Sequence, residues 1–123
     1  MDASIKNILK NDTTIKVNGS LWLESADGHF FGPGPVELLE RIAETGSINM
    51  AAKEMNMSYK KAWALVNTLN AQTTTPMVIA QTGGKKGGGS TITAEALELI
   101  KYHRLLRKRF TAFLNAETKR LKI

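Results

Sequence analysis

Cations, hydrogen-bond donors and aromatic rings gather in one stretch of the chain, between Asn49 and Asn67. Lysine side chains bind phosphate oxygens, amides and hydroxyls bind base edges, and aromatic rings offer a flat apolar face. Such a set predicts contact with a nucleic acid. The residues expected to make that contact are Asn49, Ser58, Tyr59, Lys60, Lys61, Trp63 and Asn67.

Residues suited to catalysis or metal binding are few. The chain has no cysteine, and its two histidines, His29 and His103, fall in different expected elements. No carboxylate pair, Ser/His pair or metal-ligand spacing stands out. The sequence therefore predicts a protein that is not an enzyme, with no cofactor and no metal.

The stretch from Met50 to Asn67 has the pattern of two short helices joined by a tight turn. Ala52 is the small residue that a close helix crossing needs, and Asn56, four positions later, suits a left-handed turn. The apolar residues that would lock the pair are Ala51, Met55, Met57, Ala62 and Leu65. A helix-turn-helix presents the first turn of its second helix to the major groove of DNA. The alternative is a plain helical hairpin in a small core. Tyr59 and Trp63 could likewise be core residues and not contact residues, and for Trp63 we expect partial burial.

A glycine-rich segment follows this pair and lies between two short apolar runs. It does not fit the phosphate-loop pattern G-x-x-x-x-G-K-[ST], because Gly83 and Gly88 are followed by Gly89 and Ser90. A hairpin directly after a helix-turn-helix is typical of a winged helix. Its wing, at about 77–93, would lie on the DNA backbone or in the minor groove, where Lys85 and Lys86 add positive charge. A mobile solvated loop is the alternative.

Two elements are expected before the helix pair. Residues 15–31 alternate apolar and polar positions and predict a hairpin with an Asp-Gly turn. A helix is expected at about 35–45, with Pro35 at its first position and Gly46 as its C-terminal cap. Its predicted apolar face consists of Val36, Leu39, Ile42 and Ala43.

The helix pair itself is predicted as a helix at 50–55 capped by Asn49, and a helix from Ser58 to about Gln72. The second helix would bury Ala62, Leu65, Val66 and Leu69. Strands are expected at 77–80 and 90–93. Thr93 would then cap a last helix, from about Ala94 to Leu121.

This last helix is long for the chain. About 28 residues extend roughly 42 Å, whereas a compact globule of this length has a radius of gyration of about 14 Å. Such a helix would project, and a second copy of the chain is the simplest partner for its apolar stripe. The residues expected in the dimer interface are Leu99, His103, Leu106, Phe110 and Phe113. The alternative is a helix folded back on its own domain over its first half.

The distribution of charge favours a polyanionic partner. Residues 1–58 hold 5 Lys and Arg against 8 Asp and Glu, whereas residues 59–123 hold 12 against 3. A basic half favours nucleic acid, although a solubilising surface would have the same composition. No stretch is apolar enough for a transmembrane helix and the first residues lack a secretory signal, so we expect a cytoplasmic protein without a membrane partner.

Several motifs together resemble a known family. The run ETGSI, the run AAKEMNMSYKKAW and the glycine-rich TGGKKGGGSTIT resemble the DNA-binding domain of molybdate-responsive regulators of the ModE type. More distantly, they are similar to the LysR-type winged helix. The resemblance covers about residues 15–115 and implies a homodimer with Ser58, Tyr59, Lys60 and Lys61 opening the recognition helix. It also implies a long C-terminal helix in the dimer interface.

The resemblance stops before the molybdate-binding C-terminal domains of the full-length regulators, for which this chain has no sequence. Molybdate sensing by this chain is therefore not expected, and a separate effector-sensing protein could carry the signal. The expected fold class is mainly α with small β, a winged helix-turn-helix with an N-terminal β-hairpin and a long C-terminal dimerisation helix. The expected divisions are a flexible segment at 1–14, the DNA-binding domain at 15–93 and the dimerisation helix at 94–123.

The predicted function is that of a homodimeric, sequence-specific regulator of transcription that binds double-stranded DNA. Its recognition helix, at about 58–72, would enter the major groove. The alternative function is a winged-helix module that binds a protein or RNA without recognising an operator. Salt dependence separates a protein partner from a nucleic acid, because phosphate contacts make affinity fall steeply with ionic strength.

Overall fold

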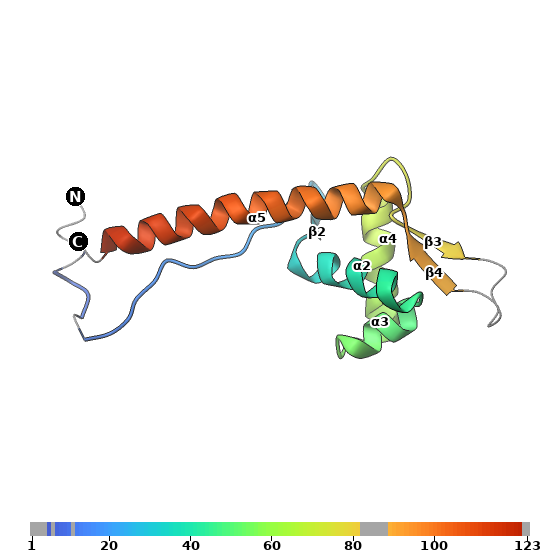
Figure 1. The fold of residues 1–123 in the computed structure, drawn as a ribbon, viewed down its shortest axis with the longest axis horizontal. Helices are drawn as coiled ribbons and strands as arrows, with labels where there is room; N and C mark the ends of the chain where they lie inside the picture. The colour runs from blue at the N-terminus through green and yellow to red at the C-terminus, as the bar shows by residue number, and fades with distance from the viewer. Residues whose placement is uncertain (1–4, 6, 11, 82–88, 122–123) are drawn as a thin grey trace. The chain divides into compact units, whose positions relative to one another are not determined.

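The computed structural model describes residues 5, 7–10, 12–81 and 89–121. The chain forms two compact units, one of Trp22–His103 and one that combines Met1–Leu21 with Arg104–Ile123. The larger unit holds three helices, two small hairpins and the start of the long last helix, which confirms the predicted winged helix-turn-helix (Figure 1). The elements in chain order are β1 (Leu23–Ser25), β2 (Gly28–Phe31), α2 (Pro33–Thr45), α3 (Ile48–Glu54), α4 (Tyr59–Ala71), β3 (Val78–Gln81), β4 (Gly89–Ile92) and α5 (Ala94–Leu121).

The first hairpin is shorter than the sequence predicts. Strands β1 and β2 pair antiparallel around the Asp-Gly turn, where Gly28 has a φ of 116° and the Ser25 hydroxyl accepts the Asp27 N–H at 3.1 Å. The predicted hairpin of residues 15–31 is therefore correct only in its second half. Residues 15–21 form no strand.

Residues 15–21 pack instead within the smaller unit, against the second half of α5 (Figure 1). The Val17 N–H donates to the Thr118 hydroxyl at 2.8 Å, and the Arg107 guanidinium donates to the Gly19 carbonyl at 3.3 Å. A Cβ added at Gly19 would lie 3.3 Å from the Phe110 ring. The backbone of this segment therefore bonds to side chains of a helix and not to a neighbouring strand. Alternation of apolar residues does not distinguish these two arrangements.

Helix α2 begins at Pro33, two residues before the predicted start at Pro35. Both prolines fit the first turn, because the N–H groups there have no partner within the helix. Gly46 caps the helix as predicted, with a φ of 72° and its N–H bonded to the Ile42 carbonyl at 2.8 Å. The predicted apolar face needs one correction: Leu38 is buried, whereas Ala43 is exposed.

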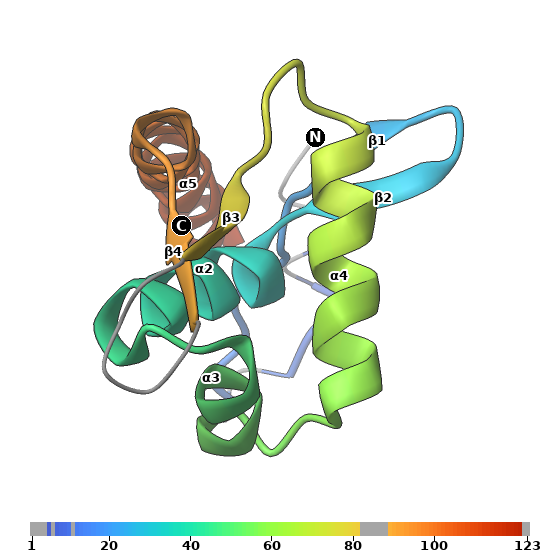
Figure 2. The ribbon, with the colours of Figure 1, turned by 90° about the vertical axis from the view of Figure 1, so that its right-hand side faces the viewer.

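Helices α3 and α4 meet at the predicted left-handed turn (Figure 2). Asn56 has a φ of 53°. Helix α3 begins at Ile48 and Ser47 caps it, accepting the Met50 N–H at 3.1 Å, so the predicted cap at Asn49 is wrong. Ser58 caps α4 as predicted, accepting the Lys61 N–H at 3.0 Å.

The core of the larger unit lies between α2, α3, α4, β2 and the start of α5. Alanines at the helix contacts have no side chain beyond Cβ, so the helices approach closely. His103 is also buried, 5% exposed, and its ring meets Phe31 edge to face at a centroid distance of 5.5 Å. The most deeply buried members are Phe31, Leu38, Leu39, Ile42, Ala51, Ala52, Ala62, Leu69 and Ala96.

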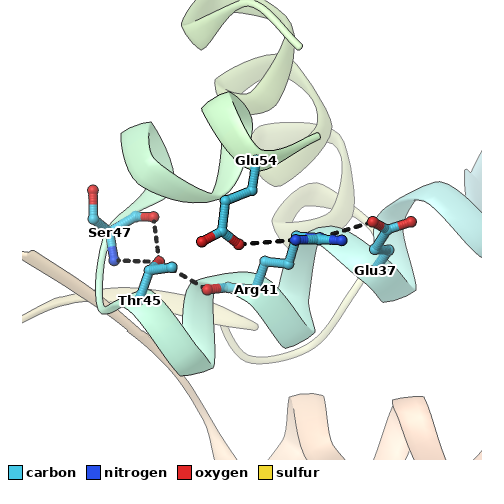
Figure 3. Close-up of polar contacts among 5 residues, drawn as sticks. All are labelled: Glu37, Arg41, Thr45, Ser47 and Glu54. Carbon is cyan, nitrogen blue, oxygen red and sulfur yellow. Dashed lines mark hydrogen bonds and ion pairs between the residues drawn. The ribbon is translucent and has the colours of Figure 1, made fainter. Parts of the chain in front are cut away.

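Arg41 ties α2 to α3 on the surface (Figure 3). Its guanidinium donates to Glu37, one turn earlier, at 2.7 Å and to Glu54 of α3 at 2.9 Å. Both hydrogen bonds raise the pKa of the Arg41 guanidinium, and the bond with Glu54 has the larger effect. Beside it, the Thr45 hydroxyl donates to the Arg41 carbonyl and accepts the Ser47 N–H, which joins the end of α2 to the cap of α3 (Figure 3).

The second hairpin confirms the predicted strands to within one residue. Strands β3 and β4 pair antiparallel, with Val78 opposite Ile92. Residues 82–88, including Lys85 and Lys86, lie outside the described residues. Thr93 caps α5 as predicted, because its hydroxyl accepts the Ala96 N–H at 3.2 Å.

Asn56 offers a direct test of the turn. Replacement of Asn56 by glycine should leave the melting temperature unchanged or slightly raised, because glycine adopts a positive φ without strain. Replacement by valine should lower the free energy of unfolding by more than about 1 kcal/mol, because a β-branched side chain resists a positive φ. Thermal unfolding followed by circular dichroism measures both variants. Equal melting temperatures for the two would contradict a left-handed residue at this position.

Candidate nucleic-acid interface

The first turn of α4 presents its side chains to solvent. Tyr59, Lys60 and Lys61 are exposed there, directly after the Ser58 cap. The buried side of the same helix holds Ala62, Val66 and Leu69. The helix is therefore fixed by its apolar side while its cationic first turn stays free to contact another molecule.

A face of α4 is formed by residues four apart. Tyr59, Trp63 and Asn67 follow one another at that spacing, and all three are exposed. The Tyr59 and Trp63 ring centroids lie 6.1 Å apart, with their planes at 47°. Trp63 is 40% exposed, so part of the indole is available to another molecule.

The charge on the helix pair is mostly positive. Helices α3 and α4 carry three lysines, Lys53, Lys60 and Lys61, all exposed. Their single carboxylate, Glu54, is bound by Arg41 and so adds little negative field. Such a surface attracts phosphate groups.

Asn49, predicted from sequence, lies on α3 rather than before it, and it is exposed. It lines one hollow together with Tyr59, Trp63 and Ser90 at the base of the second hairpin. The structure thus brings together residues from three elements. The sequence pattern does not point to Ser90, because only the fold places the base of the hairpin beside the helix pair.

The residues predicted for the dimer interface have different surroundings. Leu99 packs partly against the core of the larger unit and His103 is buried there. In the smaller unit, Leu106 and Phe110 are half-buried, whereas Phe113 is 57% exposed. Leu105, which lies outside the predicted stripe, is 48% exposed. Along α5, exposed apolar residues such as Leu105 lie directly beside half-buried ones such as Leu106. The periodicity of the sequence therefore does not tell which of them face solvent.

Within the part of the chain that the structure describes, no group of histidines and carboxylates could hold a metal ion. Over the same residues, no helix is both long and apolar enough to cross a membrane.

Comparison with known proteins assigns the helix-turn-helix to a family. Residues 35–97 match the family described as bacterial regulatory helix-turn-helix protein, lysR family. These residues include α2 from Pro35 onward, both helices of the pair, the second hairpin and the start of α5.

Several bacterial proteins named ModE or molybdenum-pterin-binding protein are also similar to the chain. It is 40% identical over 79 residues to the transcriptional regulator ModE of Haemophilus influenzae, covering 64% of this chain and 31% of that protein. It is 37% identical over 106 residues to the molybdenum transport protein ModE of Herbaspirillum seropedicae, and this match covers 86% of this chain and 38% of that protein. It is 44% identical over 73 residues to the molybdenum-pterin-binding protein MopB of Rhodobacter capsulatus, and this match covers 59% of this chain and 27% of that protein.

The chain spans about a third of the length of these relatives. Its own helix-turn-helix, with a capped second helix and a left-handed turn, agrees with the family that the comparison finds. With its ModE-like domain, the chain belongs to the lysR family of bacterial regulatory helix-turn-helix proteins.

Proposed function

We propose that the chain is a sequence-specific DNA-binding regulator of transcription, with α4 as its recognition helix in the major groove. The observation that carries this proposal is the first turn of α4. There a capped helix holds Tyr59, Lys60 and Lys61 exposed, beside the second hairpin, in a fold whose family is regulatory. Lysines on that turn would bind phosphates, and the side chains at Trp63 and Asn67 would meet base edges.

The remaining parts have distinct proposed roles. Residues 15–93 contact DNA, with the wing on the backbone or in the minor groove, and residues 94–123 join two copies of the chain. A two-fold dimer places two recognition helices about 34 Å apart, which requires a roughly palindromic site. In the described part of α5, Phe113 and Leu105 are the exposed large apolar residues of the smaller unit, and they support this role.

The lysines of α4 provide the main test. On a site selected from a random DNA library, Lys60→Ala and Lys61→Ala should each weaken binding and make the logarithmic salt slope shallower by about one unit. Fluorescence anisotropy at several salt concentrations measures both quantities. Lys101→Ala, which removes an exposed lysine of α5, is the control of equal charge. Unchanged affinity and slope for both α4 variants would remove this helix from the DNA-binding face, and tighter binding of RNA or a protein would favour the alternative function.

Ser58 combines a structural role with the proposed contact. Ser58→Ala should lower the free energy of unfolding by about 1 kcal/mol, because the Lys61 N–H loses its acceptor. Ser58→Asp retains an acceptor and should keep most of the stability, but its negative charge should repel phosphates and weaken DNA binding. Urea unfolding and anisotropy measure the two effects. If Ser58→Asp bound DNA as well as the native chain does, the first turn of α4 would lie away from the phosphates.

Phe113 tests the assembly. Burying a large apolar side chain is worth about 1.5–3 kcal/mol, so Phe113→Asp should convert a dimer to a monomer that keeps its helical circular dichroism. Most specific affinity should be lost with the second recognition helix. Light scattering gives the mass, and Asn115→Asp, an exposed change of equal charge on α5, is the control. A wild-type monomer at micromolar concentration, or a variant that stays dimeric, would exclude this face of α5 as the main interface.

A further inference from the structure

A hollow of about 310 Å³ opens between the start of α3, the first two turns of α4 and the base of the second hairpin. It lies within the larger unit, on the face that carries the predicted contact residues. The residues that line it are Ser47, Ile48, Asn49, Tyr59, Trp63, Ala80, Gly89 and Ser90.

The lining is suited to a flat, partly apolar group. Two aromatic rings, Tyr59 and Trp63, stand with their planes inclined and their centroids 6.1 Å apart, and Tyr59 is 49% exposed. Ile48 adds a buried apolar side chain. The exposed amide of Asn49 offers two N–H donors and a carbonyl acceptor side by side.

Among the lining side chains that the structure describes, none is a cation. The lysines of α4 offer a phosphate its charged donors outside the hollow, where the binding is stronger. An apolar edge with a neighbouring hydrogen-bonding group is the better match.

The walls of the hollow are fixed by a backbone contact. The Ser90 N–H donates to the Gly46 carbonyl at 2.9 Å, which joins the start of β4 to the end of α2. A Cβ at Gly89 would lie only 2.6 Å from the same carbonyl oxygen, so glycine is required for this close approach. On the opposite side, the Ser47 hydroxyl fixes the start of α3 by accepting the Met50 N–H. These contacts fix the backbone on two sides of the hollow.

We infer that this hollow receives the methyl-bearing major-groove edge of a thymine, and that Tyr59, Trp63 and Asn49 determine specificity for a T·A pair there. In the major groove a thymine offers a C5 methyl group beside the O4 acceptor, and its adenine partner offers N7 and N6. The rings would cover the methyl group, and the Asn49 amide would bond O4 or the adenine edge. This inference rests on the proposed function, because the base reaches the hollow only when α4 enters the major groove.

Deoxyuridine provides the experiment, because it differs from thymidine only by the methyl group. A site is first selected from a random DNA library with the full chain, and each thymine of that site is then replaced singly by deoxyuridine. At one thymine of each half-site the affinity should fall about fourfold, the effect expected for one buried methyl group. Replacements elsewhere should have little effect.

The variant Trp63→Ala then connects the effect to the hollow. It should bind more weakly, and its thymine-to-uracil affinity ratio at the sensitive position should fall to about one. Thr68→Ala, an exposed change on the opposite side of α4, should keep the ratio of the native chain. Circular dichroism checks that both variants are folded, and the deoxyuridine scan of the native chain tests the inference without any variant.

The outcomes separate the inference from the function on which it rests. Sequence-specific binding with no sensitive thymine overturns the inference alone. A sensitive thymine whose ratio is unchanged in folded Trp63→Ala also overturns it, because the methyl group would then contact another part of the chain. If the full chain enriches no sequence from the random DNA library, the proposed function and the inference are both overturned.

Discussion

The close contact between α3 and α4 is the constraint on which the rest of the DNA-binding face depends. Ala51, Ala52 and Ala62 are buried at this contact, and the Met57 N–H bonds back to the Ala52 carbonyl at 2.9 Å. The chain can turn so tightly only because Asn56 takes a left-handed conformation. A larger side chain at any of the three alanines would separate the helices and change the direction in which the first turn of α4 points.

The end of α2 organises the other side of that face. Gly46 ends the helix with a positive φ, and its carbonyl then accepts the Ser90 N–H of the second hairpin. The next residue, Ser47, caps α3. One short connection therefore sets the positions of α2, α3 and β4, and the hollow between α3, α4 and the hairpin follows from it. Arg41 adds a tie between α2 and α3 on the surface.

Helix α5 contributes to both compact units. Its first residues bury Ala96, Ile100 and His103 in the larger one, so this stretch cannot be removed without opening that core. Farther along, its side chains pack with residues 15–21. Apolar residues on the helix thus have two kinds of surroundings, and only those left exposed, such as Phe113, support contact with a second copy.

Local signals in the sequence were sufficient for the helix pair, the caps at Gly46, Ser58 and Thr93, and the second hairpin, because each depends on the chemistry of a few neighbouring residues. The family resemblance came from the same segments. Tertiary structure decided what local patterns leave open. Residues 15–21 have the alternation of a strand but pack on a helix, and His103 has the spacing of an interface residue but lies against Phe31. The hollow depends on elements about 40 residues apart, from Ser47 to Ser90, and periodicity carries no information about which distant segments meet.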